Sequence, residues 1–185
     1  MELKKEIITH LIPSLIFFLV SLIFLWSKLS VLNIFFLFSG TIIGTFIIDI
    51  DHFIYCFITH PNSPSGQQAT SYLKNNQYSK AFFSVFNTHT QHHQLTFHSA
   101  TFIPLWALFS LFIITSTTSI FAQSLVLAGY LHLLKDIWDE QNSIPQNLNK
   151  WLFWQIKTPV SQKFQKYFVY SSTTAFLILL FIFIS

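Results

Sequence analysis

Five stretches of the sequence are poor in charged side chains and approach or reach the length that crosses a lipid bilayer. They cover residues 8–26, 31–55, 99–116, 119–138 and 168–184. A spanning helix needs about 20 apolar residues. Only 9% of the 185 residues are charged and 52% are hydrophobic, which is too apolar for a soluble domain. The sequence therefore predicts an all-α fold, a polytopic membrane helical bundle with about five transmembrane helices.

The polar remainder is too short for a separate soluble domain, so we expect one membrane-embedded domain over residues 1–185. Its expected parts are a core at 8–140, an interfacial segment with a short helix at 141–167, and a C-terminal anchor helix at 168–184. The stretch 59–78 is rich in Pro, Ser, Asn and Gln and is expected to be an exposed loop. Gly40 and Gly44 have GxxxG spacing, which predicts close packing of the second span against another helix.

Every positive charge is a lysine, because the sequence contains no arginine. If the N-terminus is cytoplasmic, eight lysines fall in cytoplasmic segments and only Lys28 falls outside, as the positive-inside rule favours. We therefore expect an N-terminus in the cytoplasm and contact with membrane lipid. No basic patch with base-reading side chains is present, so nucleic acid is not an expected partner. The pattern defines no oligomeric state.

Histidine and aspartate are concentrated in a few short motifs. Four of the eight histidines lie in residues 87–99, NTHTQHHQLTFHS, and all four aspartates lie in residues 49–51 and 136–139. With a single cysteine, Cys56, a metal would be held by His, Asp or Glu. The expected topology puts these motifs at the cytoplasmic ends of four spans. The candidates are His10, Asp49, Asp51, His52, His93, His98, His132, Asp136 and Asp139. Ionisable groups at membrane depth usually mark function or pairing.

The spacing of these residues favours shared ligand sets. His132 and Asp136 are four residues apart, and Asp49 and His52 are three apart, so each pair faces one side of a helix. Asp51 points elsewhere unless the helix ends there. Each motif alone also fits a hydrogen-bonded pair, a solvated helix end or an incidental histidine tract. Together, on one side of one bundle, they predict a metal site.

The motifs DIDH at 49–52, HQLTFHS at 93–99 and GYLHLLKD at 129–136 resemble those of the YdjM-type family of inner-membrane metal-dependent hydrolases. The similarity covers about residues 8–140. It implies a bacterial-type inner (plasma) membrane location and metal or catalytic roles for a defined set of residues. These are Asp49, Asp51, His52, His93, His98, His132 and Asp136, together with His10. The sequence differs from the family pattern at Ile48 for proline, at Gln94 and Leu95 for Arg-Gly, and in placing His132 one residue early.

We therefore expect a membrane-bound, zinc-type hydrolase that acts on a phosphoester or similar bond of a lipid or interfacial substrate, with its site facing the cytoplasm. It would hold about one to three Zn²⁺ ions. Asp51 or Asp49 is the candidate general base or bridging ligand. Ser99, His89, His92 and Asp139 are expected to orient ligands or contact the substrate. Lys135 or Lys80 is the candidate cation in place of the missing arginine.

Two other functions fit parts of the sequence. A relative with an altered central motif would be a non-catalytic metal-binding or transport protein of the membrane. The spacing His89-x-x-His92-His93 is that of a histidine box in di-iron membrane oxidoreductases. Those enzymes need further boxes, which this sequence lacks.

Overall fold

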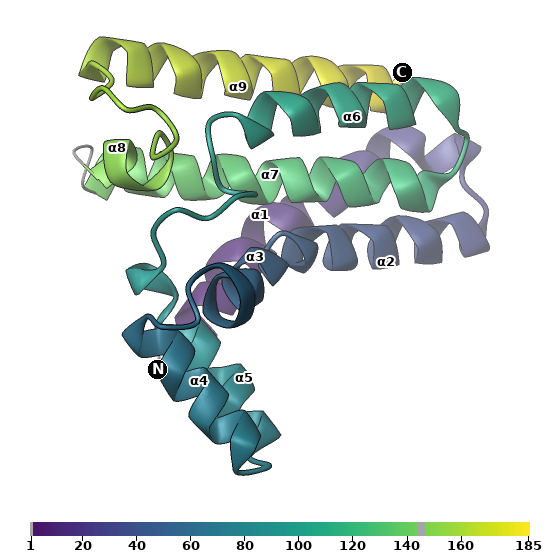
Figure 1. Cartoon of the computed structure of the whole chain (residues 1–185). Coiled ribbons are helices and arrows are strands. Elements are labelled where there is room, and N and C mark those ends of the chain that lie inside the picture. The colour runs from purple at the N-terminus through teal and green to yellow at the C-terminus, as the bar shows by residue number, and fades with distance from the viewer. Residues whose placement is uncertain (1, 144–146) are drawn as a thin grey trace.

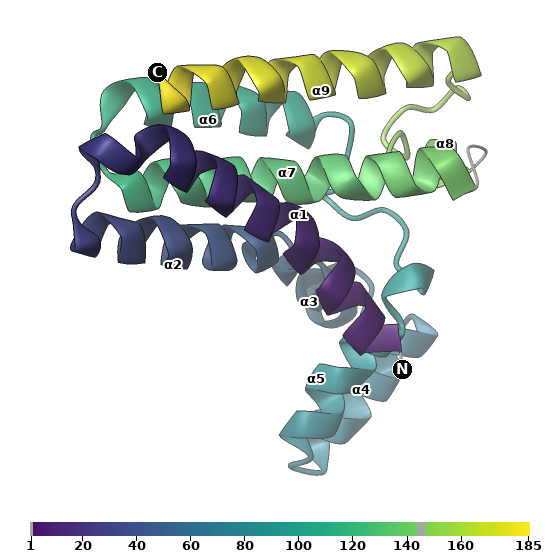
Figure 2. The same ribbon diagram turned by 180° about the vertical axis from the view of Figure 1, so that it is seen from behind.

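The fold is all-helical, as predicted, and four of its helices are long and apolar enough to cross a membrane (Figure 1). The computed structural model describes the backbone of residues 2–143 and 147–185, with side chains from Ile7 onward. The four long helical segments are α1 (Glu2–Leu25), α2 (Val31–Ile47) with its continuation to Thr59, α7 (Ile120–Ser143) and α9 (Gln162–Ile184). Figure 2 shows that α1 crosses the others obliquely and that α2, α7 and α9 run side by side. These helices indicate an integral membrane protein.

The third apolar run forms a shorter helix than a membrane span requires. Helix α6 (Phe102–Ser116) has 15 residues, and at 1.5 Å per residue it is about 22 Å long, against a hydrocarbon core of about 30 Å. It packs against α7 and α9. Of the five expected spans, therefore, four have the length and α6 is an apolar helix that lies beside them.

Small residues let α2 and α7 pack closely, as the GxxxG spacing predicted. A Cβ atom added to Gly40 would lie 2.5 Å from the Phe121 carbonyl oxygen, and one added to Gly44 would lie 2.2 Å from the Leu125 carbonyl oxygen. Both oxygens belong to the backbone of α7, which cannot move aside as a flexible side chain can. This prediction is confirmed, and the close contact aligns the ends of α2 and α7.

The second apolar run is broken where a continuous helix over 31–55 was predicted. Helix α2 ends at Ile47, α3 (Ile50–Ile54) begins after a tight turn, and a single π-helical turn, η2 (Tyr55–Thr59), follows. The amides of Asp49 and Asp51 bond to carbonyls three residues back, as in a 3₁₀ turn. Because of this break, the side chains of Asp49, Asp51 and His52 do not follow the spacing of one continuous helix.

Residues 59–78 were predicted to be a loop, and this was wrong for most of the stretch. They and the next residues form a helical hairpin, α4 (Pro64–Lys74) and α5 (Tyr78–Asn87), followed by the short η3 (His89–Gln91). Ser63 caps α4 by accepting a bond from the Gly66 amide, and Pro64 occupies the first helical position, where its lack of an N–H costs nothing. The hairpin projects across the direction of the long helices (Figures 1 and 2).

The chain between α7 and α9 returns to the end of the bundle. The expected short helix is α8 (Leu148–Trp151), and Leu148, Leu152 and Phe153 are buried. The Ala100 amide donates to the Leu152 carbonyl, which fixes this segment against the start of α6. Helix α9 begins at Gln162, six residues before the predicted anchor, and the Tyr130 hydroxyl of α7 donates to the Ser172 carbonyl of α9 at 3.0 Å.

We expect Gly44→Val to destabilise the protein by roughly 1–3 kcal/mol, because a side chain there would strike the backbone of α7. The control is Ile43→Phe, which adds bulk at the residue before Gly44. Ile43 is 47% exposed, so this change should leave the stability nearly unchanged. Thermal unfolding of both variants in the same detergent measures the difference. Equal melting temperatures for the two would contradict the packing described above.

Candidate metal centre

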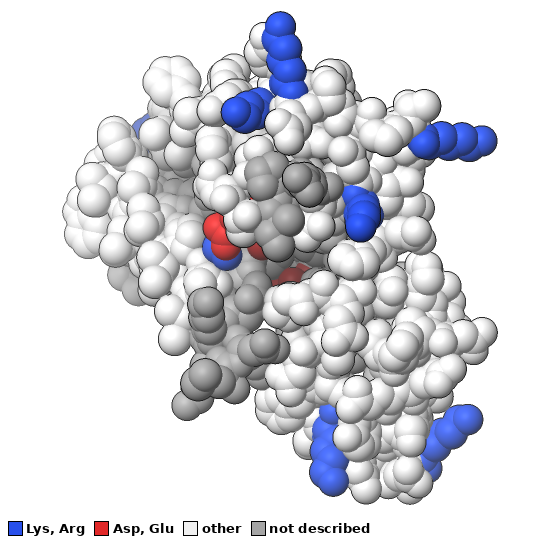
Figure 3. All heavy atoms as spheres, turned by 90° about the vertical axis from the view of Figure 1, so that its left-hand side faces the viewer, with Lys and Arg blue, Asp and Glu red and all other residues white. Residues whose placement is uncertain are grey.

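The histidines and aspartates of the four motifs meet at one end of the bundle. Figure 3 looks onto this end and shows acidic atoms in a central hollow, with lysine side chains around the edge. A pocket of about 820 Å³ opens here. Its lining includes side chains from the start of α1, the end of α2, α3, the segment before α6 and the end of α7.

The first ligand group joins α1 to α7. His10 Nε2 lies 3.4 Å from Asp136 Oδ1, and His132 Nε2 lies 3.1 Å from Asp136 Oδ2. The rings of His10 and His132 stack with centroids 4.2 Å apart. The spacing of four residues puts His132 and Asp136 on one face of α7, as predicted. One ligand atom from each of the three residues lies within 4.8 Å of the others, so they could hold one metal ion.

The second ligand group joins α3 and its preceding turn to the segment before α6. It consists of Asp49, His52 and His98, whose ligand atoms also lie within 4.8 Å of one another. His52 Nε2 is 3.9 Å from Asp49 Oδ1. Asp49 is only partly buried and lines the pocket, whereas His52 and His98 are buried. This group could hold a second metal ion.

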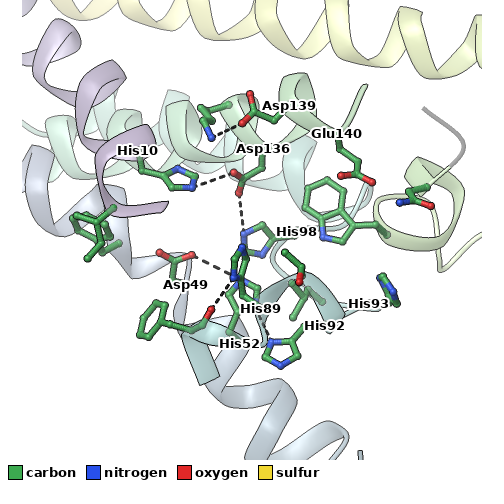
Figure 4. A pocket seen from close by; sticks show the side chains of 18 of the residues that line it. His10, Asp49, His52, His89, His92, His93, His98, Asp136, Asp139 and Glu140 are labelled. Carbon is green, nitrogen blue, oxygen red and sulfur yellow. Dashed lines mark hydrogen bonds and ion pairs between the residues drawn. The ribbon is translucent and has the colours of Figure 1, made fainter. Parts of the chain in front are cut away.

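The two groups adjoin each other, and Figure 4 shows the contact between Asp136 of the first and His98 of the second. His132 Nε2 of the first lies 3.4 Å from Asp49 Oδ1 of the second, and His98 Nε2 of the second lies 3.4 Å from Asp136 Oδ2 of the first. Asp49 and Asp136 are therefore the residues through which the groups contact each other. Carboxylates that can reach two ions are the usual bridges of two-metal sites.

The separations are compatible with metal ligands as well as with ion pairs. Ligands at 2.0–2.1 Å from a tetrahedral zinc ion are about 3.3 Å apart, and four of the five His–Asp contacts in the centre are 3.1–3.4 Å. Within the described part of the chain, the Nε2 atoms of His98 and His132 are buried and have no hydrogen-bond partner. Such atoms are costly to bury unless something else binds them.

Asp51 fixes the orientation of the His98 ring through the ring's Nδ1 side. Its Oδ2 accepts bonds from the backbone amides of Phe97 and His98, and it lies 3.5 Å from His98 Nδ1. Burial alone would lower the pKa of His98, but the carboxylates of Asp136 and Asp51 raise it above its usual value. A carboxylate on Nδ1 leaves Nε2 directed at the ligand group and makes the ring a stronger ligand. Asp51 does not line the pocket.

His92 holds His52 in the same way. The two Nδ1 atoms are 3.0 Å apart, and His92 Nε2 lies 3.2 Å from Thr88 Oγ1 and 3.4 Å from Cys56 Sγ. The Thr88 hydroxyl donates to the Ser84 carbonyl, so its oxygen can accept from His92 Nε2. His92 Nδ1 is then an acceptor, His52 Nδ1 donates to it, and His52 Nε2 keeps its lone pair for a metal. Burial lowers the pKa of His92 to about 4, so its ring is neutral near pH 7.

The structure brings together six of the eight residues predicted as ligands: His10, Asp49, His52, His98, His132 and Asp136. Asp51 belongs to neither group and contacts Nδ1 of His98 instead. His93 is exposed and belongs to neither group, although it lines the rim of the pocket. Neither of the ligand groups found among the described residues contains His89, His92 or His93, the residues of the histidine-box spacing.

The remaining candidates have more peripheral places. The buried Ser99 hydroxyl donates to the Thr96 carbonyl and accepts from the Phe102 amide, which supports the start of α6. His89 Nδ1 lies 2.7 Å from the Phe86 carbonyl, and the His89 ring lies near that of His52. Asp139 lines the pocket and pairs with Lys135 at 2.5 Å. Lys80 is an exposed residue of α5.

Some lining residues were not predicted from the sequence. They are Glu140, Asn147, Trp151 and the aromatic residues of α5. The amphipathic pattern of residues 78–87, YSKAFFSVFN, and the Ser63-Pro64 start of the preceding helix were signals that indicate two helices here. No comparable signal marks Glu140 or Asn147, because only the fold brings them to the pocket.

We expect Asp51→Asn to weaken zinc binding about 10- to 100-fold, the range found when a residue that orients a ligand is removed. His98 would remain in place, but its Nδ1 would lose the carboxylate that it contacts. Competitive titration with a zinc-binding dye measures the affinity. His60→Ala is the control, since His60 directly follows η2 and lines no part of the pocket. An unchanged affinity in Asp51→Asn would contradict the role given to Asp51.

His92→Leu should weaken zinc binding by a similar factor of about 10 to 100, because His52 loses the acceptor of its Nδ1 proton. His92→Gln, whose amide oxygen can accept that proton, should restore part of the affinity. His93→Ala tests the neighbouring residue, which is exposed, and should bind zinc as the wild type does. A stronger effect at His93 than at His92 would reverse this assignment.

Comparisons with known proteins identify no family for this chain. Comparison with protein-family models, with curated proteins and with solved structures gave no match. The residues that the structure describes contain four helices long and apolar enough for a membrane and two largely buried His/Asp groups that could bind metal.

Proposed function

We propose that this protein is a membrane-bound, metal-dependent hydrolase of the kind that its motifs resemble. The observation that carries the proposal is the contact between two His/Asp groups at the bottom of one open pocket. Two metal ions side by side are typical of enzymes that hydrolyse phosphoesters. Ligand sets of histidine and carboxylate without thiolate favour zinc or a similar divalent ion.

The residues divide into those that hold the metals and those that orient them. His10, His132 and Asp136 would hold one ion, and Asp49, His52 and His98 the other. Bound zinc lowers the pKa of a coordinated water to about 7 and polarises a phosphoryl or acyl oxygen. Asp51 and His92 keep two of the histidine rings in the orientation and tautomer that a metal requires.

Asp49 is the better of the two predicted candidates for the general base. Its carboxylate lines the pocket and lies between the two groups, whereas Asp51 is buried behind His98. Asp49 can therefore accept a proton from a water in the pocket through the carboxylate oxygen that holds no metal. Lys135 also lines the pocket and is the nearest substitute for the missing arginine, as a point charge for a phosphate oxygen.

The protein would lie in a bacterial-type inner membrane with its N-terminus and its site in the cytoplasm. The lysine count favours this orientation. A site at that face reaches both lipid headgroups and cytoplasmic solutes. A carrier would instead need acidic or histidine side chains spaced through the bilayer, whereas those of the two described His/Asp groups gather at one end.

The test is metal analysis and phosphodiesterase assay of the purified protein loaded with Zn²⁺. We expect bound zinc and turnover of bis-p-nitrophenyl phosphate in the wild type. His132→Ala and Asp136→Ala should lose metal and at least about 10²-fold of kcat/KM. His60→Ala should keep both, since it lies outside the centre.

Three outcomes separate the functions. Metal binding with hydrolysis supports the enzyme. Stoichiometric metal without hydrolysis of phosphate or carboxylic esters supports a metal-binding or transport protein instead. Full metal content in His132→Ala and Asp136→Ala contradicts the centre itself.

A further inference from the structure

The pocket above the metal centre has two chemically different sides. One side is polar and is lined by Lys135, Asp139, Glu140 and Asn147, from the end of α7 and the segment after it. The other side is apolar and is lined by residues of α1, α2 and α5, namely Ile7, Phe46, Phe82, Phe83 and Phe86. In Figure 4, Asp139 and Glu140 lie on one side of Asp136, and Asp49 and His52 lie on the other. A ligand that fills this pocket is itself amphiphilic.

The apolar side carries aromatic rings that contact one another in a row. Phe53 follows His52 in α3, and its ring centroid lies 5.5 Å from those of both Phe82 and Phe86. Phe82 contacts Phe83 with centroids 5.7 Å apart. Phe53 and Phe86 are partly buried, whereas Phe82 and Phe83 are each 48% exposed. Phe82, Phe83 and Phe86 line the same pocket as His52, so the row joins the pocket to the surface of the molecule.

The hairpin that carries this row is suited to the surface of a membrane. It runs across the direction of the spanning helices (Figures 1 and 2) and so along the plane of a bilayer. Tyr78 and Leu73 add to its exposed apolar surface, and the exposed Lys74 and Lys80 lie in the same two helices. Aromatic residues next to lysines are typical of segments at the headgroup level, where lysine attracts anionic lipid.

We propose that Phe82, Phe83 and Phe86 form the binding surface for the hydrocarbon chain of a membrane lipid whose phosphate-containing headgroup reaches the His/Asp centre. The lipid enters sideways from the bilayer along α5, so its chain remains in an apolar environment while its headgroup moves toward the polar side of the pocket. This proposal rests on the metal centre of the proposed function and names its substrate class as a phospholipid. A water-soluble phosphoester would leave the aromatic row exposed to water, which is unfavourable.

The experiment detects the lipid phosphorus next to the metal and needs no hydrolysis. The protein is reconstituted in phosphatidylcholine nanodiscs with a minor fraction of phosphatidic acid and loaded with Mn²⁺, and excess ion is removed. Paramagnetic relaxation of ³¹P then reports headgroups that approach the bound ion, and lipids that only surround the helices contribute little. Inorganic phosphate in a second sample tests a soluble ligand.

We expect relaxation of the phosphatidic acid phosphorus in the wild type and a reduction of about tenfold in Phe82→Ala/Phe83→Ala at equal Mn²⁺ content. The matched control is Phe109→Ala/Phe112→Ala. These two residues of α6 are 45% and 62% exposed and line no part of the pocket, so the double variant should behave as the wild type does.

Other results overturn the proposal. Equal relaxation in the wild type and in Phe82→Ala/Phe83→Ala would show that the aromatic row does not guide the lipid. Relaxation of inorganic phosphate but not of the lipid would identify a soluble ligand. A wild type that holds Mn²⁺ without lipid relaxation overturns the lipid surface and leaves the metal centre, whereas lipid relaxation without turnover by the zinc form overturns only the hydrolase.

Discussion

The carboxylate of Asp136 is the group on which the arrangement of the site depends. Its Oδ1 contacts His10 of α1, and its Oδ2 contacts His132 of α7 and His98 of the segment before α6. An unpaired charge inside a spanning helix costs roughly 2.5–3.5 kcal/mol on insertion scales. The three histidines, or a metal held between them, remove that cost. One acidic residue therefore fixes the relative positions of three parts of the chain.

The packing of the helices sets the geometry of the centre. Because Gly40 and Gly44 lack side chains, α2 lies against the backbone of α7, and Asp49, just after α2, comes within 3.4 Å of His132. A larger residue at either glycine would move the helices apart and separate these ligands. Within a bilayer the hydrophobic effect does not hold helices together, so close packing of this kind carries much of the association. Stability and ligand geometry thus depend on the same contact.

The sequence predicted those features that depend on local spacing. The apolar runs predicted the long helices, the GxxxG spacing predicted the close helix packing, and the four-residue interval predicted that His132 and Asp136 share one face of a helix. It assigned His93 to the ligands and His92 to the residues that orient them, but His93 belongs to neither ligand group of the described residues, because neighbouring residues outside a regular helix have no fixed periodicity. The choice is made by contacts from elsewhere in the chain: Cys56 and Thr88 bind the ring of His92, and Asp51 reaches His98 across 47 residues. Helix α4 was missed because the polar composition of residues 59–78 concealed a helix that Ser63 caps.

The break after Ile47 connects the chemistry of the site with its access. A straight helix through residues 31–59 would distribute Asp49, His52 and Phe53 around its circumference in one fixed pattern. The turn lets Asp49 contact α7, while His52 faces His98 and His92, and Phe53 packs on the rings of α5. His52 of the second ligand group and Phe53, whose ring packs on the aromatic row, are therefore neighbours in the chain. In the proposed phospholipid hydrolase, a bond held at the metals would lie where the apolar side of the pocket meets its polar side, and in a phospholipid that boundary is the ester and phosphate region of the headgroup.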